Sequence, residues 1–115
     1  MRKVILASLL VFATAAPAMS AELIVATWQR SNGTKIKYSG SGTYCGTVLT
    51  GEYAGKSIGC MTGSGGSYKG TVKKLDEGRD YTGKAKATEN SMKLSGCALG
   101  GLICKSETLT LISRP

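Results

Sequence analysis

The chain has 115 residues, with 15 Lys and Arg against 7 Asp and Glu, a net charge of +8 at pH 7, and no histidine. The lack of histidine excludes Ser-His-Asp and Cys-His catalytic systems and removes the usual general base at neutral pH. We therefore expect a protein that is not an enzyme.

The first 21 residues have the three-part pattern of a secretory signal peptide. Arg2 and Lys3 are basic, residues 4–16 are an uncharged apolar run, and small residues follow at the predicted cleavage site within 18–21. The run is shorter than the ~20 residues of a membrane-spanning helix, and no cysteine lies at the junction for a lipid anchor. Residues 22–115 are then one soluble domain, which we expect in the periplasm or outside the cell.

Gly-rich turns divide the rest of the chain into short segments with an alternating pattern. In residues 81–88, for example, Thr82, Lys84 and Lys86 alternate with small or apolar residues, which is typical of a strand with one wet face. Many short segments at this spacing indicate an antiparallel meander, barrel or sandwich. The expected strands cover residues 23–29, 34–38, 43–49, 56–61, 67–75, 81–87, 91–99 and 102–112.

Four cysteines, an even number, all lie after the predicted cleavage site. In a small exported domain this count predicts two disulfides, which compensate for a small core. The alternative is a zinc site, but such sites favour close Cys pairs, often completed by His, and this chain offers neither. We expect no metal and no cofactor. The cysteines are Cys45, Cys60, Cys97 and Cys104.

The two glycines at 100–101 predict a two-residue hairpin turn, which fixes the register of the last hairpin. That register places Cys97 opposite Cys104, within the distance range of a disulfide. By elimination Cys45 pairs with Cys60, although the two other connectivities stay open. The alternation puts the Cys97–Cys104 bridge on the outer face or rim. The opposite face is expected to be core and carries Met92, Leu94, Ile103, Leu109 and Leu111.

Three motifs resemble the DUF2147 family of small exported bacterial proteins. They are A-T-W at 26–28, Y-C-G at 44–46 and K-L-S-G-C-A-L-G-G-L-I-C-K-S-E-T-L at 93–109. Ala26 stands where the family usually has Gly, Leu109 where it usually has Trp, and the central segment of longer members has no counterpart. The resemblance implies a small, up-and-down, lipocalin-like β-barrel of about eight strands in the periplasm, in a family without an established biochemical role.

Aromatic and basic residues are the candidates for ligand contact. The single Trp is expected to close the bottom of the core, with ligand contact as the alternative. Lysines on three neighbouring segments could form a basic band for an anionic envelope component; the alternative is a solvated face that maintains solubility. Nucleic acid is not expected, because Arg and stacking aromatics are few. The candidate ligand-binding residues are Trp28, Tyr44, Tyr81, Lys73, Lys84 and Lys86, and the band would add Lys69, Lys74 and Lys93.

Two functions are consistent with these patterns. The first is a binding module that holds a small hydrophobic or amphipathic ligand inside the barrel, or an anionic envelope component outside it. The second is a structural or protein-interaction role, as in an envelope-stress or inhibitor protein, carried by the outer surface. Both describe a monomer without a membrane anchor.

Overall fold

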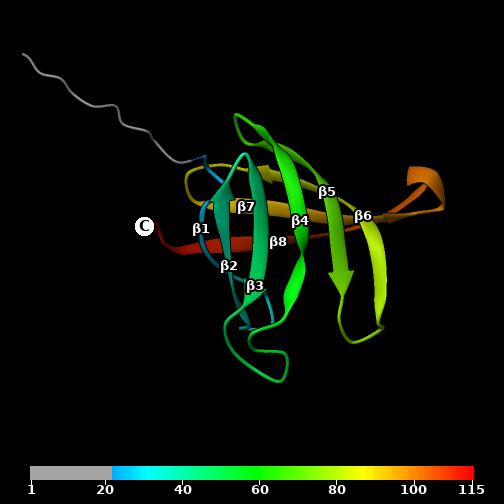
Figure 1. The fold of residues 1–115 in the computed structure, drawn as a ribbon, viewed down its shortest axis with the longest axis horizontal. Helices are drawn as coiled ribbons and strands as arrows, with labels where there is room; N and C mark the ends of the chain where they lie inside the picture. The colour runs from blue at the N-terminus through cyan, green and yellow to red at the C-terminus, as the bar shows by residue number, and fades with distance from the viewer. Residues whose placement is uncertain (1–21) are drawn as a thin grey trace, which may run out of the picture.

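The computed structural model describes residues 22–115, so the predicted signal peptide lies outside the described residues. Residues 22–115 form a closed antiparallel barrel of eight strands that pair in chain order, which confirms the predicted fold class (Figure 1). A short 3-10 turn connects the last two strands. The elements are β1 (Ala26–Gln29), β2 (Lys35–Ser41), β3 (Thr43–Val48), β4 (Ser57–Ser64), β5 (Ser67–Lys74), β6 (Arg79–Ala87), β7 (Ser91–Ala98), η1 (Leu99–Gly101) and β8 (Ile103–Ser113).

The strand ends differ from the predicted ones in two ways. β1 begins three residues later than predicted, because the preceding residues form a turn in which the Val25 N–H donates to the Glu22 carbonyl at 2.9 Å. β2 and β4 instead run on through glycines that were predicted to be turns. Ser41 still pairs with Thr43, so Gly42 alone connects β2 to β3.

A β-bulge in β4 turns an additional side chain into the barrel. Gly46 pairs with Gly59 and Thr47 pairs with Ser57, so Ile58 is the extra residue, and its side chain is buried. Gly59 has φ +105°, and a Cβ there would lie 2.2 Å from the Thr71 carbonyl oxygen. Only glycine fits this bend, which increases the local twist of the strand.

The structure confirms both predicted disulfides, Cys45–Cys60 between β3 and β4 and Cys97–Cys104 between β7 and β8. Each joins directly paired residues of neighbouring strands on the outer face of the barrel. The turn at 100–101 has positive φ at both glycines, as predicted. However, Leu99 and Leu102 do not pair with each other in the strand ladder, and strand pairing begins one residue further from the turn, at Ala98 and Ile103.

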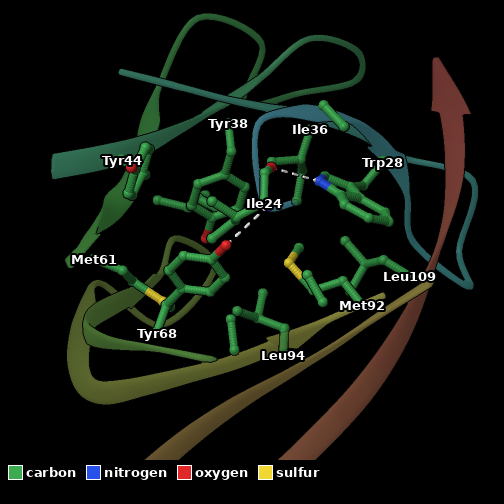
Figure 2. Close-up of a cluster of buried hydrophobic side chains, with 14 of the residues drawn as sticks. Ile24, Trp28, Ile36, Tyr38, Tyr44, Met61, Tyr68, Met92, Leu94 and Leu109 are labelled. Atoms are coloured by element: carbon green, nitrogen blue, oxygen red, sulfur yellow. Dashed lines mark hydrogen bonds between the residues drawn. The ribbon is translucent and has the colours of Figure 1, made fainter. Parts of the chain in front are cut away.

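The core fills one end of the barrel with aromatic and aliphatic side chains (Figure 2). Residues 22–25 plug this end. The Trp28 indole N–H donates to the Ile24 carbonyl at 3.0 Å, and the Tyr68 hydroxyl donates to the Glu22 carboxylate at 2.9 Å. Burial, followed by the hydrogen bond to Glu22, raises the pKa of Tyr68. The N-terminal segment of the described chain is therefore part of the fold.

Two residues depart from simple core packing. The Tyr38 hydroxyl is buried without a hydrogen-bond partner in residues 22–115, and burial raises the pKa of this group well above its usual value. Ile103 was expected in the core with Met92, Leu94 and Leu109, which are buried, but it is 52% exposed. Its side chain lies on the inward-facing row, at a point where the hairpin has extended past the barrel.

Candidate ligand-binding site

Opposite the plugged end, the barrel opens into a cavity of about 660 Å³, here called the mouth cavity. Its volume is in the range of small-molecule sites. The deep walls are apolar and come from five different strands, so the shape of the cavity is set by the barrel and not by one loop. These wall residues are Ile36 on β2, Val48 on β3, Ile58 on β4, Val72 on β5 and Leu94 on β7.

Small residues on β7 leave this space open. Gly96 lines the cavity, and the nearest atom to a Cβ added there would be the Cβ of Tyr81 at 3.5 Å, an ordinary contact. Gly83 on β6, which pairs with Gly96, has much closer neighbours. A Cβ on Gly83 would lie 2.7 Å from Val72 Cγ2 and 2.8 Å from Met61 Cε. Gly83 therefore makes room for packed side chains, whereas Gly96 makes room for a cavity.

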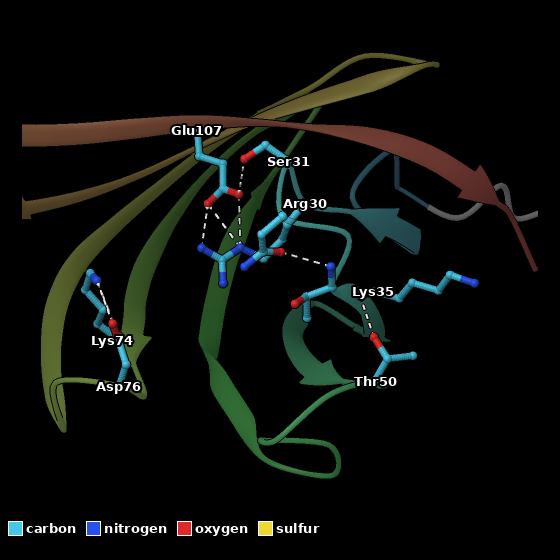
Figure 3. A network of polar contacts seen from close by, with 9 residues as sticks. Arg30, Ser31, Lys35, Thr50, Lys74, Asp76 and Glu107 are labelled. Atoms are coloured by element: carbon cyan, nitrogen blue, oxygen red, sulfur yellow. Dashed lines mark hydrogen bonds and ion pairs between the residues drawn. The ribbon is translucent and has the colours of Figure 1, made fainter.

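One side of the rim is held by an ion pair between Arg30, in the β1–β2 turn, and Glu107 on β8 (Figure 3). The Arg30 Nε donates to the two carboxylate oxygens at 3.1 and 3.0 Å, and Nη2 donates to Oε1 at 3.0 Å. The Ser31 hydroxyl adds a weak contact at 3.5 Å. The backbone ladder between β1 and β8 covers only residues 27–29 and 110–113. The ion pair therefore joins the two strands where their pairing has stopped.

The β5–β6 turn forms another part of the rim. The Tyr81 hydroxyl donates to Glu77 at 2.7 Å, and the Lys74 ammonium lies 3.2 Å from Asp76 and 3.4 Å from Glu77. The hydrogen bond from Tyr81 lowers the pKa of Glu77, and the hydrogen bond to Asp76 raises the pKa of Lys74. These contacts place polar groups around an opening whose interior is apolar.

The charges of the rim balance. The lining includes four basic residues, Arg30, Lys73, Lys74 and Lys105, and four acidic residues, Glu52, Asp76, Glu77 and Glu107. Within residues 22–115, only Lys105 and Glu52 of these eight make no ion pair. The mouth therefore has no net preference for an anion, in contrast with the basic chain as a whole.

The structure brings two of the six candidate residues to the mouth. Tyr81 and Lys73 line it. Trp28 is fully buried on the plugged side of the core, with the Arg114 guanidinium 5.7 Å from its ring centre. Tyr44 is 7% exposed and packs edge-on against Tyr68, with ring centroids 5.8 Å apart. Both aromatic residues thus belong to the packed core.

The other two candidates, Lys84 and Lys86, lie on the outer face of β6, away from the mouth. Lys69 of β5 pairs directly with Lys84, and Lys93 of β7 pairs directly with Lys86. These four lysines, here called the lysine face, share one side of three adjacent strands, as the predicted band required. Lys74 of that band lies on the opposite side of β5 and points to the mouth.

In comparisons with known proteins, the chain matched no family model, no curated protein and no solved structure. The likeness to DUF2147 stays a prediction. Residues 22–115 contain no group of His, Cys, Asp and Glu placed to hold a metal ion. No helix in this part of the chain is long and apolar enough to span a bilayer.

Sequence reasoning did not identify Arg30, Glu107 or Gly96 as site residues. Arg30 and Glu107 are 77 positions apart, and no local pattern connects them. Gly96 is one of 16 glycines in the chain. The alternation of β7 does place Gly96 on the inner face, and this was the one usable signal for a space inside the barrel.

Proposed function

We propose that this protein is a non-enzymatic binding module that holds a small amphipathic ligand in the mouth cavity, with the apolar part inside and the polar part at the rim. The observation that carries the proposal is the mouth cavity itself, an apolar space beneath a ring of charged groups. Because the rim charges balance, a neutral or zwitterionic polar group fits better than a strong anion.

We further propose that the protein acts outside the cytoplasm, in the periplasm or after secretion, as a monomer. Two disulfides between neighbouring strands support an oxidising compartment, since such bonds are rare in the cytosol. The apolar run near the N-terminus supports the same location.

Titration with Nile red, an uncharged dye that fluoresces in apolar surroundings, tests the cavity. For Nile red, with about 24 non-hydrogen atoms at about 0.3 kcal/mol per atom, the expected Kd is about 5 µM. Gly96→Leu places a side chain in the cavity without a clash at Cβ and should weaken binding at least tenfold. Thr108→Leu, on the outer face of β8, is the matched control and should bind like the wild type.

Ala98→Leu fills the same cavity from its rim, and it is the variant to test for dye binding if Gly96→Leu does not fold. Native mass spectrometry of protein purified from the producing cells gives a second measurement, in which a retained small molecule is expected. Dye binding that survives both cavity-filling substitutions, or no dye binding at all, would overturn the proposal.

A further inference from the structure

The β7–β8 hairpin extends beyond the rest of the barrel (Figure 1). On one side, β7 pairs with β6 only as far as Cys97, opposite Thr82. On the other side, β8 pairs with β1 only from Thr110 onward. The end of the hairpin, residues 98–103, therefore has no strand beside it in the described chain.

This hairpin end is apolar. Leu99, Leu102 and Ile103 are 69%, 85% and 52% exposed, and they are three of the five large hydrophobic residues that residues 22–115 expose. Leu99 also has φ +54°, the one positive φ among the non-glycine residues described, in a region that Gly or Asn adopts more readily. The turn therefore carries large exposed apolar side chains that its backbone conformation does not require.

The lysine face lies on the same hairpin and the two strands next to it. Its register places like charges directly opposite each other, Lys69 beside Lys84 and Lys86 beside Lys93, an arrangement that destabilises a sheet. None of the four makes an ion pair within residues 22–115. Lysines can protect a free sheet edge, but here they lie on strands that are paired on both sides.

The apolar end and the lysine face are close enough to meet one surface. On the outer face, Lys84 pairs with Ser95 on β7, and Ser95 pairs with Ser106 on β8. Ser106 is four residues from Leu102, a distance of about 13 Å along an extended strand. The outer residues between them are polar or form the Cys97–Cys104 disulfide.

We propose that this hairpin docks the protein on a bilayer rich in anionic phospholipid. Leu99 and Leu102, in the turn at the end of the hairpin, enter the interfacial region, while the lysine face lies against the head groups. Two apolar side chains are too few for a standard protein interface, and stable attachment to a membrane surface generally needs a second signal beside a short apolar one. The unpaired lysines supply it. Because neither leucine lines the mouth cavity, the proposal is independent of the ligand there.

Co-sedimentation of the protein with vesicles tests this docking. Vesicles of equal parts phosphatidylglycerol and phosphatidylcholine should bind the protein, and pure phosphatidylcholine vesicles should not. Binding should be lost at about 1 M salt, where the Debye length is about 3 Å. Each lysine near an anionic leaflet contributes about fivefold in affinity, so Lys84→Gln with Lys86→Gln should weaken binding about 30-fold.

Matched controls separate the two contributions. Leu99→Ser with Leu102→Ser should weaken binding at least tenfold, whereas Leu49→Ser, which changes an exposed leucine in the β3–β4 loop, should have no effect. Lys35→Gln with Lys37→Gln removes two charges from β2, and it should weaken binding less than fivefold.

Three results would overturn the proposal. The first is equal binding to neutral and anionic vesicles. The second is equal effects of the hairpin variants and their controls. The third is self-association in sedimentation velocity that Leu99→Ser with Leu102→Ser abolishes, because the apolar end would then be an interface between copies of the chain.

Discussion

The Arg30–Glu107 pair should stabilise the closed barrel by a measurable amount, although it lies at the rim. Two unit charges about 4 Å apart interact by about 1 kcal/mol in water and about 4 kcal/mol near a protein surface. The side chains are 39% and 24% exposed, so solvent screens much of this attraction, and ordering two long side chains costs entropy. We expect a coupling free energy of about 1 kcal/mol, at the upper end for exposed pairs because the contact is bidentate.

A double-mutant cycle measures this coupling. Arg30→Met, Glu107→Gln and the double variant are unfolded in urea, with the fluorescence of Trp28, the single and fully buried tryptophan, as the probe. A 1 kcal/mol change moves the urea midpoint by about 0.5–1 M for a domain of this size. The coupling should fall by at least half at about 1 M salt.

The Lys73–Asp80 pair provides the control. Its charged atoms are 4.0 Å apart and its side chains are 45% and 62% exposed, so a cycle of Lys73→Met and Asp80→Asn should give a coupling near zero. The reasoning is refuted if the rim pair couples by less than about 0.3 kcal/mol, the usual error of additivity, or no more strongly than the control.

Three further predictions follow from packing and covalent structure. Gly83→Ala should destabilise the protein by about 1–3 kcal/mol in urea unfolding and Gly96→Ala by less than about 1 kcal/mol; equal effects would contradict the assigned contacts. Tyr38→Phe should be neutral or stabilising and Tyr68→Phe destabilising by about 1 kcal/mol, because only the second hydroxyl is hydrogen-bonded. Since burial raises the pKa of Tyr38, the unfolded chain ionises this group above pH ~10 while the folded protein does not, so stability declines there and Tyr38→Phe should flatten that alkaline decline. Replacing both cysteines of Cys45–Cys60, which closes the longer loop, should lower the free energy of unfolding by about 3 kcal/mol, against about 2.4 kcal/mol for Cys97–Cys104. The reversed order in thermal unfolding would exclude a loop-entropy origin of the stabilisation.

Features that depend on neighbouring residues could be predicted from the sequence. The period of two in residues 81–87 and 91–98 follows from the geometry of a strand, and the Gly-Gly turn then set the Cys97–Cys104 register. The disulfide Cys45–Cys60 followed because the remaining cysteines also lie on adjacent strands.

Features that depend on the closed barrel could not be predicted. The bulge at Ile58 breaks the alternation, so counting along β4 assigns this side chain to the wrong face. Tyr44 is large and apolar, which predicts burial but not the end of the barrel it fills, whereas Trp28 was expected to close the bottom of the core and lies there. Ile103 is on the inner row, but the sequence does not show that the hairpin extends beyond its neighbouring strands there and leaves this side chain exposed.

The positions of the two disulfides have a consequence for the order of folding. Each closes a hairpin, with sequence separations of 15 and 7 residues, so each can form as soon as two consecutive strands meet. Neither crosses the contact between β1 and β8, where residues such as Trp28 and Leu111 pair across almost the whole described chain. Contacts of such long sequence separation are slow to form. Oxidation can therefore be complete in a chain whose first and last strands have not yet met, and closing the barrel is left to non-covalent contacts alone.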